Sequence, residues 1–442
     1  MDNASNREKL LKAAQDLNIP LPKGKYIKND VLKRLIIEYV NRKKTKTNKS
    51  IKKRSPLNLT AKLKKCNQNQ NQNQNQSNSR ISRSLKQNKY KIDIKKSLFP
   101  KVKKLVAIGD IHGDLPAAIK ALKLAGVIDQ SIPNNLKDIN KIKWTGDKTV
   151  VVQLGDQIDR VRPGKLVNDL CPENDSELVS DEGSDLKIIC LFEKLHSEAA
   201  KVGGALFSIF GNHELMNVDG DFRYVSPKEF KEFGNFFKEA STISQAQNVP
   251  YGYITRKEVF KPGGTLAKKL AHTRYSIIQV GSWLFVHGGI TAQMASEYTI
   301  DDVNRHIKDW LIGHNDIETL SHANNIYHRD DDENSPFWSR TFSDCQDWDE
   351  LKSSKHFYYT LNVLNKKNNR QPNTEIKGMI VGHSPQFMYG KGLNSTCNNK
   401  LWRVDVGMSR AFGELNNNDR ETQNRRVQVL EITNDNEFRI LE

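Results

Sequence analysis

The chain has 442 residues, enough for two or three domains, and it carries a formal net charge of +17 with only 37% hydrophobic residues. No run approaches the ~18 consecutive apolar residues of a membrane-spanning helix, and the opening MDNASNREKL lacks the apolar core of a signal peptide. The five cysteines are scattered without a CxxC pair, which favours free thiols in a reducing compartment. We therefore expect an intracellular protein, cytoplasmic or nuclear, with no membrane partner.

The basic charge is confined to one end of the chain. Residues 1–104 hold 29 lysines and arginines against 6 acidic residues, whereas the remaining residues hold 40 against 46. The globular part is therefore slightly acidic, and the net charge alone does not indicate a nucleic-acid-binding core.

The N-terminal region divides into two predicted zones. Residues 1–45 show apolar residues at helical spacing on either side of a break, which predicts a small helical module with a faint resemblance to the SAP type that binds DNA. Residues 46–100 contain lysine-rich and Asn/Gln repeats that cannot bury enough apolar surface to fold, so we predict a disordered basic linker. Two interpretations of this region stay open: contact with nucleic acid, or docking to a partner and localisation.

Residues 101–442 have the pattern of a globular α/β domain. Helical periodicity at 116–126 and 186–204 alternates with apolar segments typical of buried strands. Those segments are 105–110, 149–156, 205–214, a hairpin at 275–289, 377–385, 401–407 and 425–433. The order predicts parallel strands joined by helical crossovers and then an antiparallel sheet, packed as two stacked mixed β-sheets flanked by helices.

Polar clusters follow five of these segments, each where an apolar strand ends. The motifs are GDIHGD (Asp110, His112), GDQIDR (Asp156, Asp159, Arg160), GNHE (Asn212, His213), VHGG (His287) and VGHSP (His383). Any one of these residues alone would more often be a helix cap or a buried, hydrogen-bonded histidine. Because the carboxyl ends of strands in an open α/β sheet converge on one crevice, the ordered set predicts a site for divalent metal ions.

This ordered series resembles the calcineurin-like metallophosphoesterase superfamily, and within it the phosphoprotein phosphatase group. The segments FWSR (337–340) and WRVDVGMS (402–409) are similar to the bacterial-type, Shewanella-like branch. The resemblance implies an α/β/β/α sandwich that holds two divalent metal ions, Mn or Fe/Zn.

The resemblance also implies a role for each site residue. Asp110 and His112 would ligate one metal, Asp156 would bridge both, and the second metal would be completed by Asn212, His287 and His383. His213 would be the general acid, oriented by Asp159, and the phosphate oxygens would be held by Arg160 and Arg340. These roles are physically reasonable, because paired cations activate a water and an arginine fork matches phosphate oxygens.

Two departures from the family pattern stand out. Many nucleases of this fold end the last motif with a second metal-binding histidine, whereas here Pro385 occupies that position and cannot ligate. This absence favours a protein phosphatase over a nuclease. The family also usually has glycine after GDxxDR, whereas here Val161 follows Arg160. The sequence therefore does not predict the conformation of the turn at this point.

The leading hypothesis is a phosphomonoesterase that hydrolyses phosphoserine, phosphothreonine or phosphotyrosine in proteins by in-line attack of a metal-bridging hydroxide. The alternative is a dinucleoside polyphosphate hydrolase or a nuclease directed by the basic tail. A catalytically silent binding protein is disfavoured, because no ligand or acid of the motif set is missing. The sequence leaves the oligomeric state open.

Overall fold

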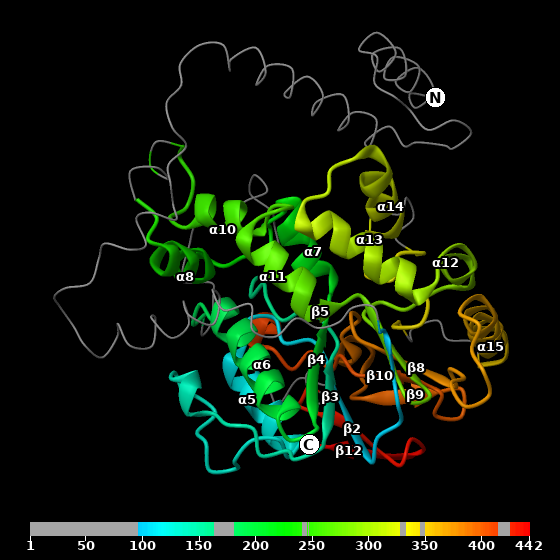
Figure 1. The fold of residues 1–442 in the computed structure, drawn as a ribbon. Coiled ribbons are helices and arrows are strands. Elements are labelled where there is room, and N and C mark those ends of the chain that lie inside the picture. Colours follow the sequence, from blue (N-terminus) through cyan, green and yellow to red (C-terminus); the bar gives the residue numbers. More distant parts are fainter. Residues whose placement is uncertain are drawn as a thin grey trace, which may run out of the picture. The chain divides into compact units, whose positions relative to one another are not determined.

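The computed structural model describes residues 96–162, 181–240, 245, 247–327, 333–344, 350–413 and 425–442 (Figure 1). The predicted helical module of residues 1–45, and the predicted linker up to residue 95, lie outside these described residues. Within the described part, no helix is long and apolar enough to cross a membrane. Cys190 and Cys397 are both free and buried, and the other three cysteines lie outside the described residues.

The first sheet has the strand order β12-β11-β2-β3-β4-β5 among the described residues. Its strands are β2 (Lys104–Ile108), β3 (Val150–Gln153), β4 (Ala205–Ile209), β5 (Arg274–Tyr275), β11 (Val429–Thr433) and β12 (Glu437–Leu441). Strands β2 to β5 run parallel, and β11 joins β2 in antiparallel orientation. Continuous runs of buried Val, Ile and Leu are typical of parallel strands covered on both faces, and the predicted strands at 105–110, 149–156 and 205–214 are confirmed.

Helices make the crossovers between these parallel strands. Helix α5 (Leu115–Leu124) follows β2 and is capped by Asp114, and α6 (Asp185–Ala200) precedes β4, as the helical periodicity predicts. Figure 1 shows both helices beside the strands β2, β3 and β4.

The second sheet has the order β1-β6-β7-β8-β10-β9 among the described residues. Its strands are β1 (Leu98–Phe99), β6 (Ile277–Val280), β7 (Trp283–Val286), β8 (Gly378–Val381), β9 (Asn394–Thr396) and β10 (Leu401–Arg403). The predicted hairpin forms between β6 and β7. The prediction of an antiparallel sheet holds only in part: β9 and β10 also pair in antiparallel orientation, whereas β7 pairs with β8, and β8 with β10, in parallel. A parallel pair needs a long connection, and four helices of the described part lie between β7 and β8.

The second sheet also begins before the predicted domain boundary at residue 101. Strand β1 pairs with β6 in parallel through Leu98 and Phe99. The two residues carry too short an apolar signal to separate them from the preceding linker by pattern alone.

Eight further helices and three short 3₁₀ segments complete the described part. They are α7 (Asn212–Asp219), α8 (Pro227–Phe237), α10 (Tyr253–Phe260), α11 (Thr265–Thr273), α12 (Ala292–Glu297), α13 (Ile300–Ile312), α14 (Ile317–Tyr327), α15 (Glu350–Lys367), η1 (Ile139–Lys141), η3 (Gln386–Tyr389) and η4 (Arg410–Phe412).

Two clusters of buried apolar side chains hold these layers together. One joins Val106 and Leu430 of the first sheet to Phe285 and Trp402 of the second, so the two sheets pack against each other. The other joins the opposite side of the second sheet, including Leu284, to side chains of α10 to α15. The predicted class of two mixed sheets flanked by helices is confirmed.

Candidate metal centre

The ends of five strands bring the predicted ligands to one place. The parallel register aligns Ile108 of β2 with Gln153 of β3, and Gln153 with Ser208 of β4. The residues that follow these strands therefore emerge at the same edge of the first sheet. The second sheet contributes His287 directly after β7 and His383 two residues after β8, and all of these side chains are buried.

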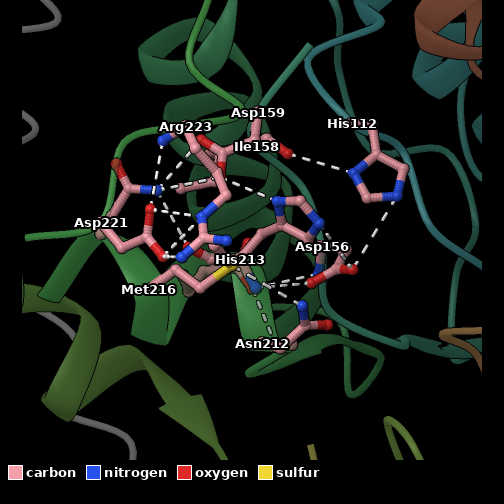
Figure 2. A network of polar contacts seen from close by, with 12 residues as sticks. His112, Asp156, Ile158, Asp159, Asn212, His213, Met216, Asp221 and Arg223 are labelled. Atoms are coloured by element: carbon pink, nitrogen blue, oxygen red, sulfur yellow. Dashed lines mark hydrogen bonds and ion pairs between the residues drawn. The ribbon is translucent and has the colours of Figure 1, made fainter. Parts of the chain in front are cut away.

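Asp156 lies at the meeting point of two clusters of ligand atoms. One cluster contains His112, Asp156 and His213, and the other contains Asp156, His287 and His383; in each, the ligand atoms lie within 4.8 Å of one another. The Oδ2 atom of Asp156 is 3.8 Å from Nε2 of His112 and 3.2 Å from Nε2 of His287. Figure 2 shows His112 and His213 on either side of this carboxylate. One carboxylate therefore serves two neighbouring groups of donors.

Backbone carbonyl groups orient three of the histidine rings. The Nδ1 atom of His112 lies 3.3 Å from the carbonyl oxygen of Ile158, and Nδ1 of His287 lies 2.6 Å from that of Leu154. His383 uses Nε2 instead, 3.1 Å from the carbonyl oxygen of Trp338. A carbonyl oxygen can only accept, so that nitrogen carries the hydrogen, and in the neutral ring the other nitrogen has its lone pair free for a metal ion. This is how proteins orient metal-binding histidines.

The side chain of Asn212 joins the second cluster through its oxygen. Its Oδ1 atom lies 3.0 Å from Nε2 of His287 and 3.1 Å from Nδ1 of His383. Asn212 begins α7, directly after the turn that leaves β4, so the helix start fixes where this oxygen points.

Asp110 belongs to neither three-residue cluster but borders them. Its Oδ2 atom accepts a hydrogen bond from the backbone N–H of His383 at 3.0 Å, and its Oδ1 atom has no hydrogen-bond partner among the described residues. Burial, with the negative charges of Asp405 and Asp156, raises the pKa of Asp110 well above its usual value. A buried carboxylate oxygen without a partner is what a cation would complete, so the donor set fits a pair of divalent metal ions.

The charges of the centre are set by the same packing. Burial alone would raise the pKa of Asp156, but His287, His213 and His112 hold it well below the usual value. Burial lowers the pKa of His112 and of His383 well below the usual value. At neutral pH the Asp156 carboxylate is therefore anionic and these two rings are neutral, the forms in which carboxylate and imidazole ligate metals.

Backbone strain is concentrated at this site. Positive φ angles occur at His112 (42°), Asp156 (49°), Asp159 (74°) and His383 (70°). Such conformations cost on the order of 1–3 kcal/mol each and persist only where the surroundings impose them. Gly211 shows how tight the site is, because a Cβ atom there would lie 2.0 Å from Oδ1 of Asp156.

His213 and Asp159 form a buried pair beside the metal ligands. The Nδ1 atom of His213 lies 2.8 Å from Oδ2 of Asp159, and its Nε2 atom lies 3.9 Å from Oδ2 of Asp156. Sequence reasoning missed Arg256, whose Nη2 donates to Oδ1 of Asp159 at 3.0 Å and to Oδ2 of Asp185 at 2.8 Å. Arg256 lies in α10 outside every motif, so only its burial in the folded protein reveals it.

The two arginines that the sequence predicts for phosphate binding lie in different settings. Arg340 donates from Nη1 to Oγ of Ser384 at 2.9 Å, next to His383. Arg160 is buried in ion pairs, with Nη1 3.0 Å from Asp114 and Nη2 3.7 Å from Glu182.

Asp405 is a second residue that sequence reasoning missed. Strand β10 pairs with β8 through Arg403 and Val381, which brings Asp405 level with His383 at the end of the neighbouring strand. One carboxylate oxygen accepts from the N–H of Gly407 at 2.8 Å, and the other has no hydrogen-bond partner among the described residues. Burial is the main cause that raises its pKa to about 6. The signal was available in WRVDVG, where an aspartate follows an apolar strand.

Known proteins are similar to this chain in sequence. Residues 103–387 match the family described as calcineurin-like phosphoesterase. The chain is 31% identical over 379 residues to Shewanella-like protein phosphatase 2 of Arabidopsis thaliana, covering 79% of this chain and 80% of that protein. It is 27% identical over 308 residues to Shewanella-like protein phosphatase 1 of Plasmodium berghei, covering 69% of this chain and 67% of that protein.

Solved structures share the fold. A point mutant of a cold-active protein tyrosine phosphatase superposes with a TM-score of 0.51 at 20% identity, covering 80% of this chain and 86% of that one. Together with the family match and the Arabidopsis relative, the arrangement of ligands after the strands identifies the chain as a hydrolase that belongs to the calcineurin-like phosphoesterase family and is similar to its Shewanella-like protein phosphatases.

Proposed function

We propose that the protein is a dinuclear metal-dependent phosphomonoesterase that hydrolyses phosphoserine, phosphothreonine or phosphotyrosine in proteins. The observation that carries this proposal is the single carboxylate of Asp156, shared by two clusters of metal-type donors and flanked by the His213–Asp159 pair. Relatives named protein phosphatases support a phosphoprotein as the substrate class.

In this proposal Asp110, His112 and Asp156 would hold one metal ion, and Asp156, Asn212, His287 and His383 would hold the other. When bound, the two divalent ions neutralise the charge of the phosphoryl group and lower the pKa of the attacking water.

The protein's own residues complete the reaction. His213 donates the proton at Nε2 to the departing oxygen of the substrate, since Asp159 occupies its Nδ1 side and keeps the ring aligned. Arg340, beside His383, and Arg160, beside Asp114 and Glu182, bind the phosphate oxygens.

The domain organisation belongs to the proposal as well. Residues 101–442, with the two-residue strand β1 before them, form the catalytic domain, and the basic region ahead of it contacts nucleic acid or a docking partner. Deletion of residues 1–95 is expected to leave the turnover of a small phosphoester intact, and a collapse of that turnover would assign the tail to the active fold.

The central test offers the full-length protein several substrates side by side. With Mn²⁺ present, phosphoserine and phosphotyrosine peptides, a dinucleoside tetraphosphate, and single- and double-stranded DNA are incubated in parallel, and phosphate or fragment release is measured. We expect release from phosphopeptides that is lost in Asp156→Asn and kept in the surface control Arg305→Gln. Turnover of the nucleotide with untouched phosphopeptides would contradict the proposal.

A further inference from the structure

The residues directly after GDQIDR depart from the family pattern. Val161 stands where the family usually has glycine, yet its backbone is not in the left-handed region. Its N–H donates to the carbonyl oxygen of Tyr224 at 3.0 Å, and its side chain is buried against Phe222, Val225 and Phe230. Val161 therefore packs against the segment after α7, and the next residue, Arg162, lies beside Tyr224.

Arg162 lies against two aromatic rings that border the metal centre. Its guanidinium carbon is 4.9 Å from the ring centroid of Phe412 and 5.4 Å from that of Tyr224. The Phe412 ring is 5.6 Å from the ring of His112, and the Tyr224 ring is 4.8 Å from the ring of His213. One aromatic ring therefore lies between Arg162 and His112, and another between Arg162 and His213, the proposed proton donor.

Among the described residues, the guanidinium of Arg162 contacts backbone carbonyl groups and rings, and forms no ion pair. Its Nη1 atom donates to the carbonyl oxygens of Asp159, at 3.1 Å, and of Val161, at 2.7 Å. In the part of the chain that the structure describes, no carboxylate forms a salt bridge with it. Burial lowers the pKa of Arg162, while the charges of Asp156, Asp159 and Asp405 act in the opposite direction.

Arg160 contrasts with Arg162 in this respect. The side chain of Arg160 is only 2% exposed and is paired with the carboxylates of Asp114 and Glu182. A cation in direct ion pairs with two carboxylates attracts an incoming anion less than one that, among the described residues, forms no ion pair. An arginine also offers several N–H groups in one plane, so Arg162 can bind two phosphate oxygens with the donors that its carbonyl contacts leave over.

We propose that Arg162 is a phosphate-binding residue of this site, contacting the phosphoryl group of the substrate and the inorganic phosphate product. Its place between Tyr224 and Phe412 holds the guanidinium by cation–π contact, close enough for its charge to act on His112 and Asp156 of the centre. The proposal rests on the proposed function. It also explains why the sequence after GDQIDR differs from the family pattern: the residue after Val161 adds a second arginine to the site.

The test measures phosphate binding directly, so it does not depend on turnover. Inorganic phosphate is titrated into the full-length, Mn²⁺-loaded protein by isothermal calorimetry, for wild type, Arg162→Met, Arg162→Lys and the control Arg305→Met. Methionine keeps a stem that packs on the two rings but removes the charge. We expect Arg162→Met to weaken phosphate binding by about 10- to 100-fold and Arg162→Lys to recover part of that loss, with the control unchanged.

Kinetics and stability separate a binding role from a structural one. In a phosphopeptide assay, Arg162→Met should raise KM and the inhibition constant of phosphate together, with thermal unfolding close to wild type. Phosphate affinity equal to wild type in folded Arg162→Met would overturn the proposal, as would an equal loss in the Arg305 control. A wild-type protein that binds phosphate through Arg162 but hydrolyses no phosphopeptide would refute the proposed function and leave this inference standing.

Discussion

Arg256 and Asp159 form an ion pair with both side chains fully buried, Nη2 to Oδ1 at 3.0 Å. The other oxygen of the same carboxylate faces His213, so Arg256 acts on the histidine only through Asp159. Asn217 reinforces the arrangement, because it donates to Asp159 and accepts from Nε of Arg256 at 2.7 Å. The orientation of His213 therefore depends on three helices, α7, α10 and, through Asp185, α6.

Arg256→Met is expected to destabilise the fold strongly. The change leaves Asp159 and Asp185 buried without their shared cation, and removing one partner of a buried pair typically costs about 3–5 kcal/mol. Urea denaturation measures the free energy of unfolding, with Arg305→Met as a surface control expected within about 0.5 kcal/mol of wild type. A wild-type midpoint for Arg256→Met would show that the pair contributes nothing.

His213→Asn is expected to slow the reaction in a way that depends on the leaving group. General acid catalysis contributes about 10²- to 10⁴-fold, and a phosphoserine peptide needs it because its alkoxide is a poor leaving group. With p-nitrophenyl phosphate the loss should be much smaller, since that phenoxide leaves without a proton. Steady-state rates on both substrates provide the comparison, and equal losses on the two would argue against the proton-donor role.

Metal ions are expected to stabilise the protein. Asp110 and Asp405 are buried close to Asp156, and burial raises the pKa of each, so a bound cation relieves their mutual repulsion. At a free Mn²⁺ concentration 100 times Kd, the gain should be about 2.7 kcal/mol, visible as a higher Tm that a chelator reverses. Asp156→Asn should remove most of this shift, and a Tm insensitive to divalent ions would contradict the assignment of the centre.

His306 is expected to make stability depend on pH. Burial, together with the stacked ring of His322 at 4.0 Å and the guanidinium of Arg305, lowers the pKa of His306 to about 4. Between pH 6.5 and 4 the unfolded chain therefore binds a proton that the folded protein does not, so stability is lost as the pH falls through this window.

Urea denaturation at pH 7 and pH 5 tests this contribution. In His306→Gln the decrease in the free energy of unfolding between pH 7 and pH 5 should be smaller than in wild type by about 1 kcal/mol, because the surroundings of His306 are partly solvated. An unchanged pH dependence would assign the effect to other groups, and His322→Gln serves as the comparison within the same stacked pair.

Part of the fold was accessible from pattern alone. Strands β2, β3 and β4 are buried apolar runs followed by polar motifs, and α5 and α6 have clear helical periodicity, so their order implied parallel pairing. The parallel pairing of β7 with β8 was not accessible, because a long helical segment separates them and nothing local records which strand the chain returns to.

The candidate site divides in the same way. A motif records residue types and short spacings. The sequence by itself therefore determined the family and the metal-type ligands after the strands, and it predicted that His213 pairs with Asp159. Tertiary structure alone decided that Arg160 forms an ion pair with Asp114 while Arg162, within the described residues, lies against two rings without one, and that Arg256 and Asp405 lie beside the centre. The physical reason is that burial and charge compensation arise between segments far apart in the chain, and no local pattern encodes which carboxylate a given arginine will meet.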